Sequence, residues 1–161
     1  MAYLLDANVF IEAANRYYAT DICPGFWAWI EREAVAGSVL SIQRVRDELV
    51  DDTLASWAAK QPPSFFAGVD ASILPHLATL ASWVPQQRYR VAAIEEFLDS
   101  ADYYLIASAM AGGHVIVTHE KPSDGQKRVK IPEPCIAHGV EYINTFTMLR
   151  RLGARFELHK P

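Results

Sequence analysis

Four acidic residues stand where a folded chain could bring their carboxylates together. They are Asp6, Glu48, Asp102 and Glu120. Asp6 ends the short apolar run 3–5, and Glu120 follows the β-branched run 115–117 by three residues. If both runs are parallel strands of one sheet, the two acids project from the same rim, because sites in open α/β sheets form beyond the carboxyl ends of the strands.

Three of these acids also have ordinary structural explanations when each is taken alone. Asp6 could cap a helix that begins near Asn8. Glu48 precedes the apolar Leu49, and it could belong to a solvated charged face. Glu120 could be a surface loop residue.

Asp102 is harder to explain as a structural residue. It stands in the first turn of a nearly all-apolar helix predicted over 101–111, where it could complement the helix dipole while Asp99 or Ser100 caps the helix. A carboxylate held against buried surface needs a partner, and no lysine or arginine lies within two turns of it in sequence. A metal ion would supply the missing positive charge.

Together, the four carboxylates indicate a site for a hard divalent cation. Mg²⁺ and Mn²⁺ prefer oxygen ligands, keep several waters, and bind through a few carboxylates plus substrate phosphate. Clustered carboxylates repel one another without an ion, so the cluster would be costly if it had no role. The chemistry that such a site performs is metal-assisted hydrolysis of a phosphodiester.

The elements that must position these acids alternate between strand and helix. The predicted strands are 3–5, 39–42, 115–117 and 140–143, with a further short strand possible at 129–131. The first predicted helix runs from Asn8 to about Tyr18, and Asp21 to Gly25 is a predicted loop. The later predicted helices are 26–36, 43–50, a segment around Leu54 and Trp57, 70–84, 90–98, 101–111 and a last helix capped by Thr145. Repeated strand–helix units predict an α/β fold with a parallel sheet and helices on both faces.

Length and composition favour one globular domain over residues 1–161. Hydrophobic residues make up 51% of the chain and charged residues 21%, which excludes a disordered protein. Cys23 and Cys135 form no CxxC pair, and the chain shows neither a secretory leader nor an apolar run near the ~20 residues of a membrane span, so we expect a cytoplasmic protein. The motifs GxxxxGK(S/T), GxGxxG, HExxH and GxSxG are absent.

Charge is spread unevenly along the chain. The formal net charge of −4 argues against binding of nucleic acid through bulk positive charge. However, residues 121–161 hold 4 acidic and 8 basic residues, whereas residues 1–120 hold 15 acidic and 7 basic ones. This last quarter could contact the phosphate backbone of a nucleic acid, through Lys121, Lys127, Arg128 and Lys130. A second basic group, Arg150, Arg151, Arg155 and Lys160, is equally well explained as a solvated face.

Several motifs in order resemble the PIN domain (PilT N-terminus) nuclease family. They are YLLDAN at 3–8, DEL at 47–49, SADYYLIASA at 100–109 and VIVTHE at 115–120. The later segments KRVKIPEPC at 127–135 and GVEYINTFTMLR at 139–150 resemble a bacterial PIN subfamily described as a domain of unknown function. The resemblance covers nearly the whole chain.

The resemblance implies a Rossmann-like three-layer α/β/α sandwich with a central parallel sheet. It places the family's first three acids on Asp6, Glu48 and Asp102, with Asn8 and Thr118 as supporting polar residues. The fourth acid usually stands in a Thr-x-Asp sequence, whereas this chain reads Thr118-His119-Glu120. The substitution of Glu for Asp leaves Asp124 as an alternate fourth acid, and Asp99 is a further candidate.

The resemblance also implies a Mg²⁺- or Mn²⁺-dependent endoribonuclease, of the VapC type found as the toxin of toxin–antitoxin pairs. Such proteins commonly dimerise, and an antitoxin blocks the acidic pocket with a basic or aromatic segment. We expect Asp6, Asp102 and Glu120 to hold the metal and Glu48 to complete the ring or position the attacking water. Family analogy gives products with 5′-phosphate and 3′-hydroxyl ends. His119 could act as a base or ligand, although a supporting role is commoner beside a hard-metal site.

Two other functions remain compatible with the sequence. A phosphatase of the haloacid dehalogenase type also begins with an Asp after the first strand, but it needs D-x-D, and this chain has Asp6-Ala7-Asn8. A catalytically inactive PIN-like scaffold that binds RNA or protein is the second, and Glu120 in place of Asp keeps it open. Binding of a divalent ion would separate the scaffold from the nuclease.

Overall fold

The structure, a computed structural model, describes residues 1–159 and contains one five-stranded sheet in which every pairing is parallel. The strand order is β3-β2-β1-β4-β5. The strands are β1 (Tyr3–Leu5), β2 (Val39–Ile42), β3 (Phe66–Ala67), β4 (Val115–Val117) and β5 (Tyr142–Ile143). The predicted parallel α/β sheet is therefore confirmed, and β3 is an edge strand that the sequence pattern did not reveal.

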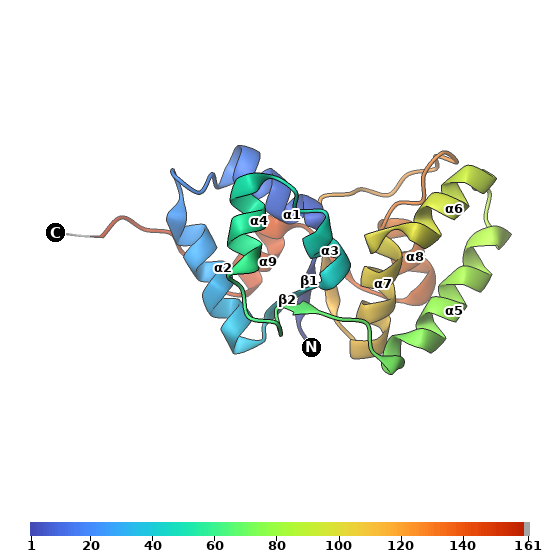
Figure 1. Ribbon diagram of the computed structural model, residues 1–161. Coiled ribbons are helices and arrows are strands. Elements are labelled where there is room, and N and C mark those ends of the chain that lie inside the picture. Colours follow the sequence, from blue (N-terminus) through green and yellow to red (C-terminus); the bar gives the residue numbers. More distant parts are fainter. Residues whose placement is uncertain (160–161) are drawn as a thin grey trace.

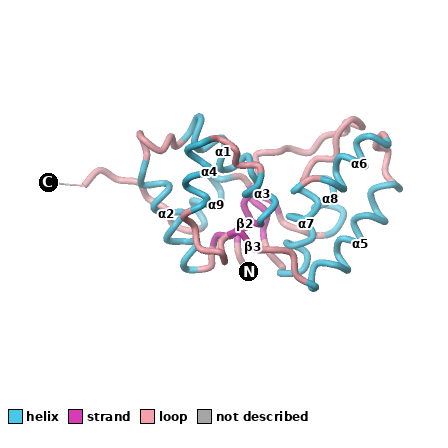
Figure 2. The backbone as a smooth tube through the Cα atoms, in the orientation of Figure 1, coloured by secondary structure: helices cyan, strands magenta, loops and turns pink. Residues whose placement is uncertain are grey.

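Helices cover both faces of this sheet. The α-helices are α1 (Ala7–Glu12), α2 (Pro24–Ala36), α3 (Gln43–Asp47), α4 (Asp52–Ala59), α5 (Leu74–Trp83), α6 (Val91–Asp99), α7 (Ala101–Gly112), α8 (Pro132–His138) and α9 (Thr145–Arg151). A π-helical turn, η1 (Ala13–Tyr17), follows α1, and the 3₁₀ turns η2 (Ala71–Ile73) and η3 (Val84–Gln86) flank α5. Figure 1 shows α1, α2, α4 and α9 on one side and α5 to α8 on the other, and Figure 2 shows the strands between them. These layers form the predicted three-layer sandwich.

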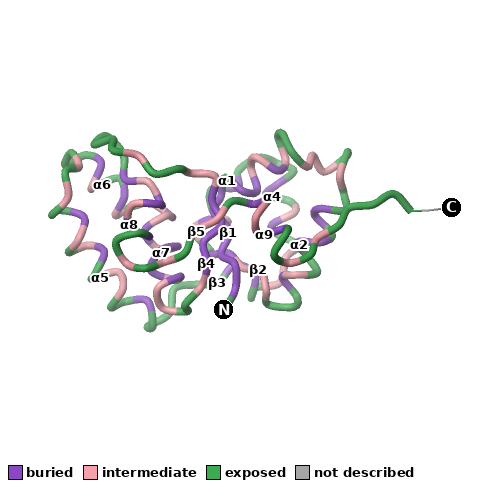
Figure 3. Tube along the Cα trace, turned by 180° about the vertical axis from the view of Figure 1, so that it is seen from behind, coloured by how far each residue is buried: buried purple, intermediate pink, exposed green. Residues whose placement is uncertain are grey.

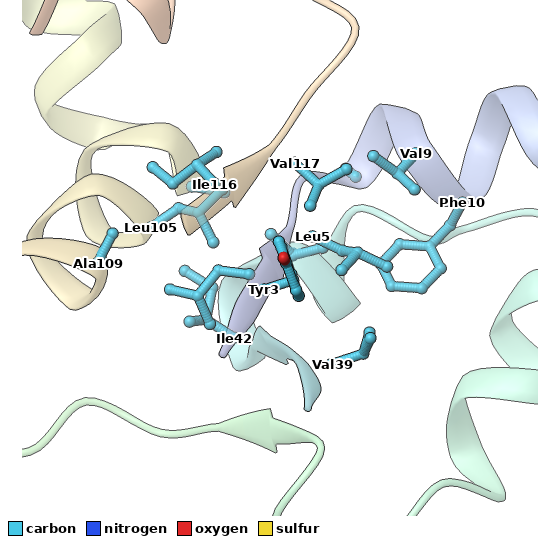
Figure 4. Packing of buried hydrophobic residues seen from close by; sticks show 14 of the residues in the cluster. Tyr3, Leu5, Val9, Phe10, Val39, Ile42, Leu105, Ala109, Ile116 and Val117 are labelled. Atoms are coloured by element: carbon cyan, nitrogen blue, oxygen red, sulfur yellow. The ribbon is translucent and has the colours of Figure 1, made fainter. Parts of the chain in front are cut away.

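The core follows from strands that are apolar on both faces, as a covered parallel sheet requires. Leu5, Ile116 and Val117 are fully buried. In Figure 4, Phe10 from α1 packs on one side of the strands and Leu105 from α7 on the other. Figure 3 shows the same burial along the strands, with exposed residues on the outer helices and loops. The core therefore fixes the strand ends on which any site must be built.

The order of the strands reverses beside β1. The chain builds β1, β2 and β3 outward in one direction and then returns to place β4 and β5 on the other side of β1. In open α/β sheets, ligands bind beyond the carboxyl ends of the strands at such a switch point. Asp6 follows β1 and Thr118 follows β4, so both leave the sheet at this point. Within residues 1–159, no helix is both long and apolar enough to cross a membrane.

Several predicted element bounds were wrong at their ends. The helix predicted over 43–50 ends at Asp47, and Glu48 is its C-cap residue. The predicted loop 21–25 is cut short because Pro24 begins α2, where its fixed φ suits the first helical turn. The last helix is capped by Asn144, whose side chain accepts a hydrogen bond from Thr147 N–H, and Thr145 is its first residue.

The largest difference between the predicted and the observed elements lies after β4. Residues 129–131 form no strand, and a helix that the sequence pattern did not predict, α8, begins at Pro132. The two prolines of α8 stand in its first turn, where they cost no hydrogen bond, although proline is usually interpreted as a helix breaker. Val129 and Ile131 are apolar because they are buried in the core, and their burial explains the false strand signal.

Candidate active site

Asp6 leaves β1 at the point where the chain turns into α1. Its backbone N–H donates to the carbonyl oxygen of Val117 at 3.0 Å. The residue holds the N-cap position of α1, yet its side chain forms no capping hydrogen bond. Instead, Oδ2 accepts a hydrogen bond from Thr118 Oγ1 at 3.1 Å, and the residue is only 3% exposed. The carboxylate is therefore held at the sheet edge and does not serve the helix.

Glu120 is held by its own loop. Its Oε1 accepts a hydrogen bond from Arg128 Nη2 at 2.7 Å, and its Oε2 accepts one from the backbone N–H of Ile131 at 2.7 Å. The backbone N–H of Glu120 donates to Thr118 Oγ1 at 3.1 Å. Thr118 therefore links Asp6 and Glu120 through a single hydroxyl.

Asp102 and Glu48 come from the elements on either side of this edge. Ser100 caps α7, because its side chain accepts a hydrogen bond from Tyr103 N–H, so Asp102 in the first turn is not needed as a cap. Helix α7 packs against β2 and β4, which brings Asp102 to the sheet edge half-buried. Glu48 is the C-cap residue of α3, and it is exposed to solvent.

Electrostatic coupling shows that the four predicted acids lie together. Burial and the nearby charge of Glu120 raise the pKa of Asp6 from 3.8 to about 7, against the opposing hydrogen bond from Thr118. Burial, followed by the charges of Asp6, Glu120 and Glu48, raises the pKa of Asp102 from 3.8 to about 8. Partial burial also raises the pKa of Glu48, and the guanidinium of Arg128 lowers it. The ionised forms of Asp6 and Asp102 are therefore unfavourable in the folded chain without a further positive charge.

The two alternate acids lie apart from this group. Asp99 is exposed at the end of α6, where its carbonyl oxygen accepts a hydrogen bond from Arg44. Asp124 is exposed in the loop after β4, and it borders a separate pocket with Arg88 and Tyr89. Neither is among the charges that raise the pKa of Asp6 or Asp102.

The predicted basic residues lie on the loop that follows β4 and runs past the start of α6 to α8 (Figure 1). Lys121, Lys127 and Arg128 are exposed, and Lys130 is half-buried. Of these four, only Arg128 forms an ion pair within residues 1–159. In the second basic group, Arg151 pairs with Glu141 at 2.7 Å and Arg155 with Glu157 at 3.8 Å, and Lys160 lies outside the described residues.

The donor set suits a hard divalent cation, although the carboxylates do not form a closed cage. Among residues 1–159, no group of three or more His, Cys, Asp or Glu side chains is placed so that it could hold a metal ion. Mg²⁺ does not need such a cage, because it keeps several waters and is commonly held by one or two carboxylates plus substrate phosphate. Asp6 and Asp102 are the pair with this character, since both are poorly solvated and unfavourable when ionised.

An aromatic cluster that the sequence pattern did not predict lies beside the acids. The ring of Tyr17, at the end of η1, lies 5.3 Å from Phe146 of α9 and 6.0 Å from His119, centroid to centroid. His119 Nε2 and Thr145 Oγ1 form a hydrogen bond of 3.0 Å, and burial lowers the pKa of this imidazole against the charge of Glu12. No short-range signal joins Tyr17 to Phe146, which is 129 positions further along the chain, and the paired tyrosines at 17 and 18 were the only hint.

The chain is similar to known proteins in two respects, its sequence family and its fold. A family model described as "Domain of unknown function (DUF4411)" matches residues 3–156. A chain in the crystal structure of VapBC2 from Rickettsia felis bound to a DNA fragment from their promoter has a similar fold, with a TM-score of 0.56 and 16% sequence identity. The match covers 89% of this chain and 98% of that one. No curated protein matches the chain. The expected α/β fold is therefore confirmed, and a chain of the VapBC2 complex shares it.

Proposed function

The chain belongs to the family described as Domain of unknown function (DUF4411), and on that premise we propose that it is a Mg²⁺- or Mn²⁺-dependent endoribonuclease. The observation that carries this proposal is the convergence of Asp6 and Asp102 at the switch point of the sheet. Two poorly solvated carboxylates whose pKa values rise to about 7 and about 8 create a place where a cation binds favourably. Single-stranded RNA supplies the phosphodiester.

In this proposal, Asp6, Asp102 and Glu120 would hold the ion, partly through water. Thr118 fixes the orientation of Asp6 by its hydrogen bond, and Asn8, exposed in the first turn of α1, is a supporting polar group. Glu48, which keeps contact with solvent, orients the attacking water. When bound, a divalent ion lowers the pKa of water and offsets charge on the phosphate oxygens.

The loop after β4 would contact the RNA backbone. Lys121 and Lys127 are exposed and form no ion pair in the described part of the chain, so their charges are available to phosphates. Arg128 pairs with Glu120 by one guanidinium nitrogen, which leaves its remaining donors for phosphate oxygens.

The proposed partners follow from fold likeness. The similar Rickettsia felis chain comes from a complex named VapBC2. We propose that this chain likewise acts as the toxin of a toxin–antitoxin pair, that an antitoxin covers the acidic edge, and that the toxin forms a homodimer. Co-purification with the product of a neighbouring reading frame tests the pairing, and light scattering of the isolated chain tests the dimer.

A catalytically inactive scaffold is the competing function, and one observation favours it. Both carboxylate oxygens of Glu120 are occupied by Arg128 and Ile131, so the fourth acid is engaged by the chain itself. A scaffold of this kind would bind RNA without cutting it.

Cleavage of RNA by three matched proteins tests the proposal. Wild-type protein should cut single-stranded RNA in Mn²⁺ and lose this activity in EDTA. Asp6→Asn should reduce cleavage to background while circular dichroism shows an intact fold. Asp124→Asn, which neutralises an exposed carboxylate of the adjacent loop, should cut at the wild-type rate. Equal cleavage by wild type and Asp6→Asn would sink the proposal, and RNA binding without cleavage by wild type would establish the scaffold.

A further inference from the structure

Three aromatic side chains from distant parts of the chain meet at the carboxyl edge of the sheet. Tyr17 ends the turn η1, His119 follows β4, and Phe146 lies in the first turn of α9. The rings of His119 and Phe146 are 6.1 Å apart, and Tyr17 lies within 6.0 Å of both, centroid to centroid. His119 is held in place by its hydrogen bond to Thr145. The three rings therefore form one aromatic cluster, in which the hydrogen bond to Thr145 fixes the ring of His119.

Tyr17 is the member of this cluster that faces solvent. Tyr17 is 49% exposed, although its aromatic ring is a large and mostly apolar surface. The next residue, Tyr18, turns the other way and stacks on the buried Phe26, with ring centroids 4.4 Å apart and planes 7° from parallel. Core packing therefore accounts for Tyr18 and leaves the outward position of Tyr17 unexplained.

The backbone at Tyr17 is irregular in a way that sets this position. Tyr18 N–H donates to the carbonyl oxygen of Ala13 at 2.8 Å, and this five-residue spacing makes residues 13–17 a π-helical turn. π-Helical turns are rare in proteins, and they are frequently found at functional sites. Here the turn places Tyr17 over His119 and Phe146.

The cluster adjoins the proposed catalytic acids. His119 lies between Thr118, which donates to Asp6, and Glu120. A pocket of about 310 Å³ opens beside it, lined by Thr118, His119 and Glu120 together with Asn144 and Thr147 of the α9 region. The aromatic cluster and the acids therefore share the carboxyl edge of the sheet, with His119 and Glu120 lining the same pocket.

We propose that Tyr17, supported by His119 and Phe146, is a stacking platform for an unpaired nucleobase next to the scissile phosphate. This inference rests on the proposed function and adds the site that holds the base beside the cleaved bond. Proteins that bind single strands stack successive bases on aromatic side chains, and every base offers a face for such stacking. The platform would thus orient the nucleotide beside the cleaved bond and tolerate many sequences.

Binding of a labelled single-stranded oligoribonucleotide, measured by fluorescence anisotropy in EDTA, tests the platform without catalysis. Stacking on one aromatic side chain contributes about 1–3 kcal/mol, so Tyr17→Ala should weaken binding by about 5- to 160-fold. Tyr17→Phe keeps the ring, and it should bind within about twofold of wild type. The dependence of affinity on salt should be the same in all three proteins, because stacking releases no counterions.

An abasic oligonucleotide of the same length separates stacking from a general loss of structure. Wild type and Tyr17→Ala should bind it equally, because it offers no base to the platform. Equal binding of the base-containing oligonucleotide by these two proteins, with wild-type cleavage intact, would overturn the platform alone and assign the exposed ring to a protein partner. Weaker binding by Tyr17→Ala, with no cleavage by wild type in Mn²⁺, would support the platform and overturn the nuclease.

Discussion

The β-sheet has an amino edge, where its strands begin, and a carboxyl edge, where they end. Polar groups find partners differently at these two edges. At the amino edge, the backbone N–H of Ala2 donates to His114 Nδ1 at 3.0 Å, and its carbonyl oxygen accepts from Val115 N–H at 3.0 Å. Tyr3 N–H donates to the carbonyl oxygen of Ser38 at 2.9 Å. Buried polar groups at this edge therefore have partners, as stability alone requires.

The carboxyl edge gathers acids whose ionised forms are unfavourable. The pKa values of Asp6 and Asp102 are raised by burial and by neighbouring carboxylates. A fold that satisfies its polar groups at one edge could do so at the other. An arrangement that costs stability where it could be avoided is typical of a functional site.

The largest contrast should appear in the pH dependence of stability. Asp102 has a folded pKa of about 8 against an ordinary value of 3.8, so between these values the folded chain binds more protons than the unfolded chain. Stability in EDTA should therefore fall as pH rises from about 4 to about 8 and level off above. Asp102→Asn removes this contribution, and its melting temperature should exceed that of wild type by several degrees at alkaline pH.

Thermal melting followed by circular dichroism across this pH range measures the difference between the two proteins. The two melting temperatures should converge near pH 4, where both side chains are uncharged. If the melting temperature of wild type equals or exceeds that of Asp102→Asn at alkaline pH in EDTA, the ionised Asp102 does not destabilise the folded chain, and this account of the carboxyl edge is contradicted.

A substitution at the amino edge should have the opposite sign. His114→Ala leaves the N–H of Ala2 without its acceptor, at a cost of about 1–3 kcal/mol. The melting temperature should fall by a few degrees, whereas the rate of RNA cleavage per folded molecule should not change. His159→Ala, at an exposed position, is the control and should change neither quantity. Loss of cleavage in folded His114→Ala would remove the functional division between the edges.

The smallest effect is expected at Arg128, because its partner Glu120 also accepts a hydrogen bond from the backbone N–H of Ile131. Arg128→Ala should cost less than about 1 kcal/mol of stability, since the arginine is largely exposed. It should lower the slope of RNA affinity against salt by about 1, as expected for one lost phosphate contact. Arg32→Ala removes a comparable surface ion pair with Glu33, on α2, and should leave the slope unchanged. Identical slopes for Arg128→Ala and wild type would mean that Arg128 does not touch RNA.

The sequence predicts those parts of the site that short-range patterns control. Asp6 stands at the end of a buried strand, and Asp102 is the one charge in a nearly apolar helix, so both positions follow from periodicity alone. The strand β3 was missed because it is only two residues long and follows two prolines. Its pairing with β2 comes from the fold, not from a local signal.

The partners of Glu120 and the aromatic cluster could not be predicted in the same way. Arg128 and Ile131 reach Glu120 because of the path of an irregular loop, for which residue type gives no geometry. The π-helical turn at Tyr17 depends on packing between η1 and α9, and no motif marks it. Such features depend on tertiary contacts, which one sequence does not encode in any local pattern.

Calorimetric titration with Mn²⁺ tests the central claim most directly. Wild-type protein should bind Mn²⁺ near pH 7 with release of protons, because Asp6, with a pKa of about 7, must ionise fully to act as a ligand. The observed heat should therefore vary with the ionisation enthalpy of the buffer. Asp6→Asn should abolish the binding, and Asp124→Asn should retain it. Wild-type protein that binds no divalent ion, or Asp6→Asn that binds Mn²⁺ as tightly as wild type, would contradict a metal site at the carboxyl edge.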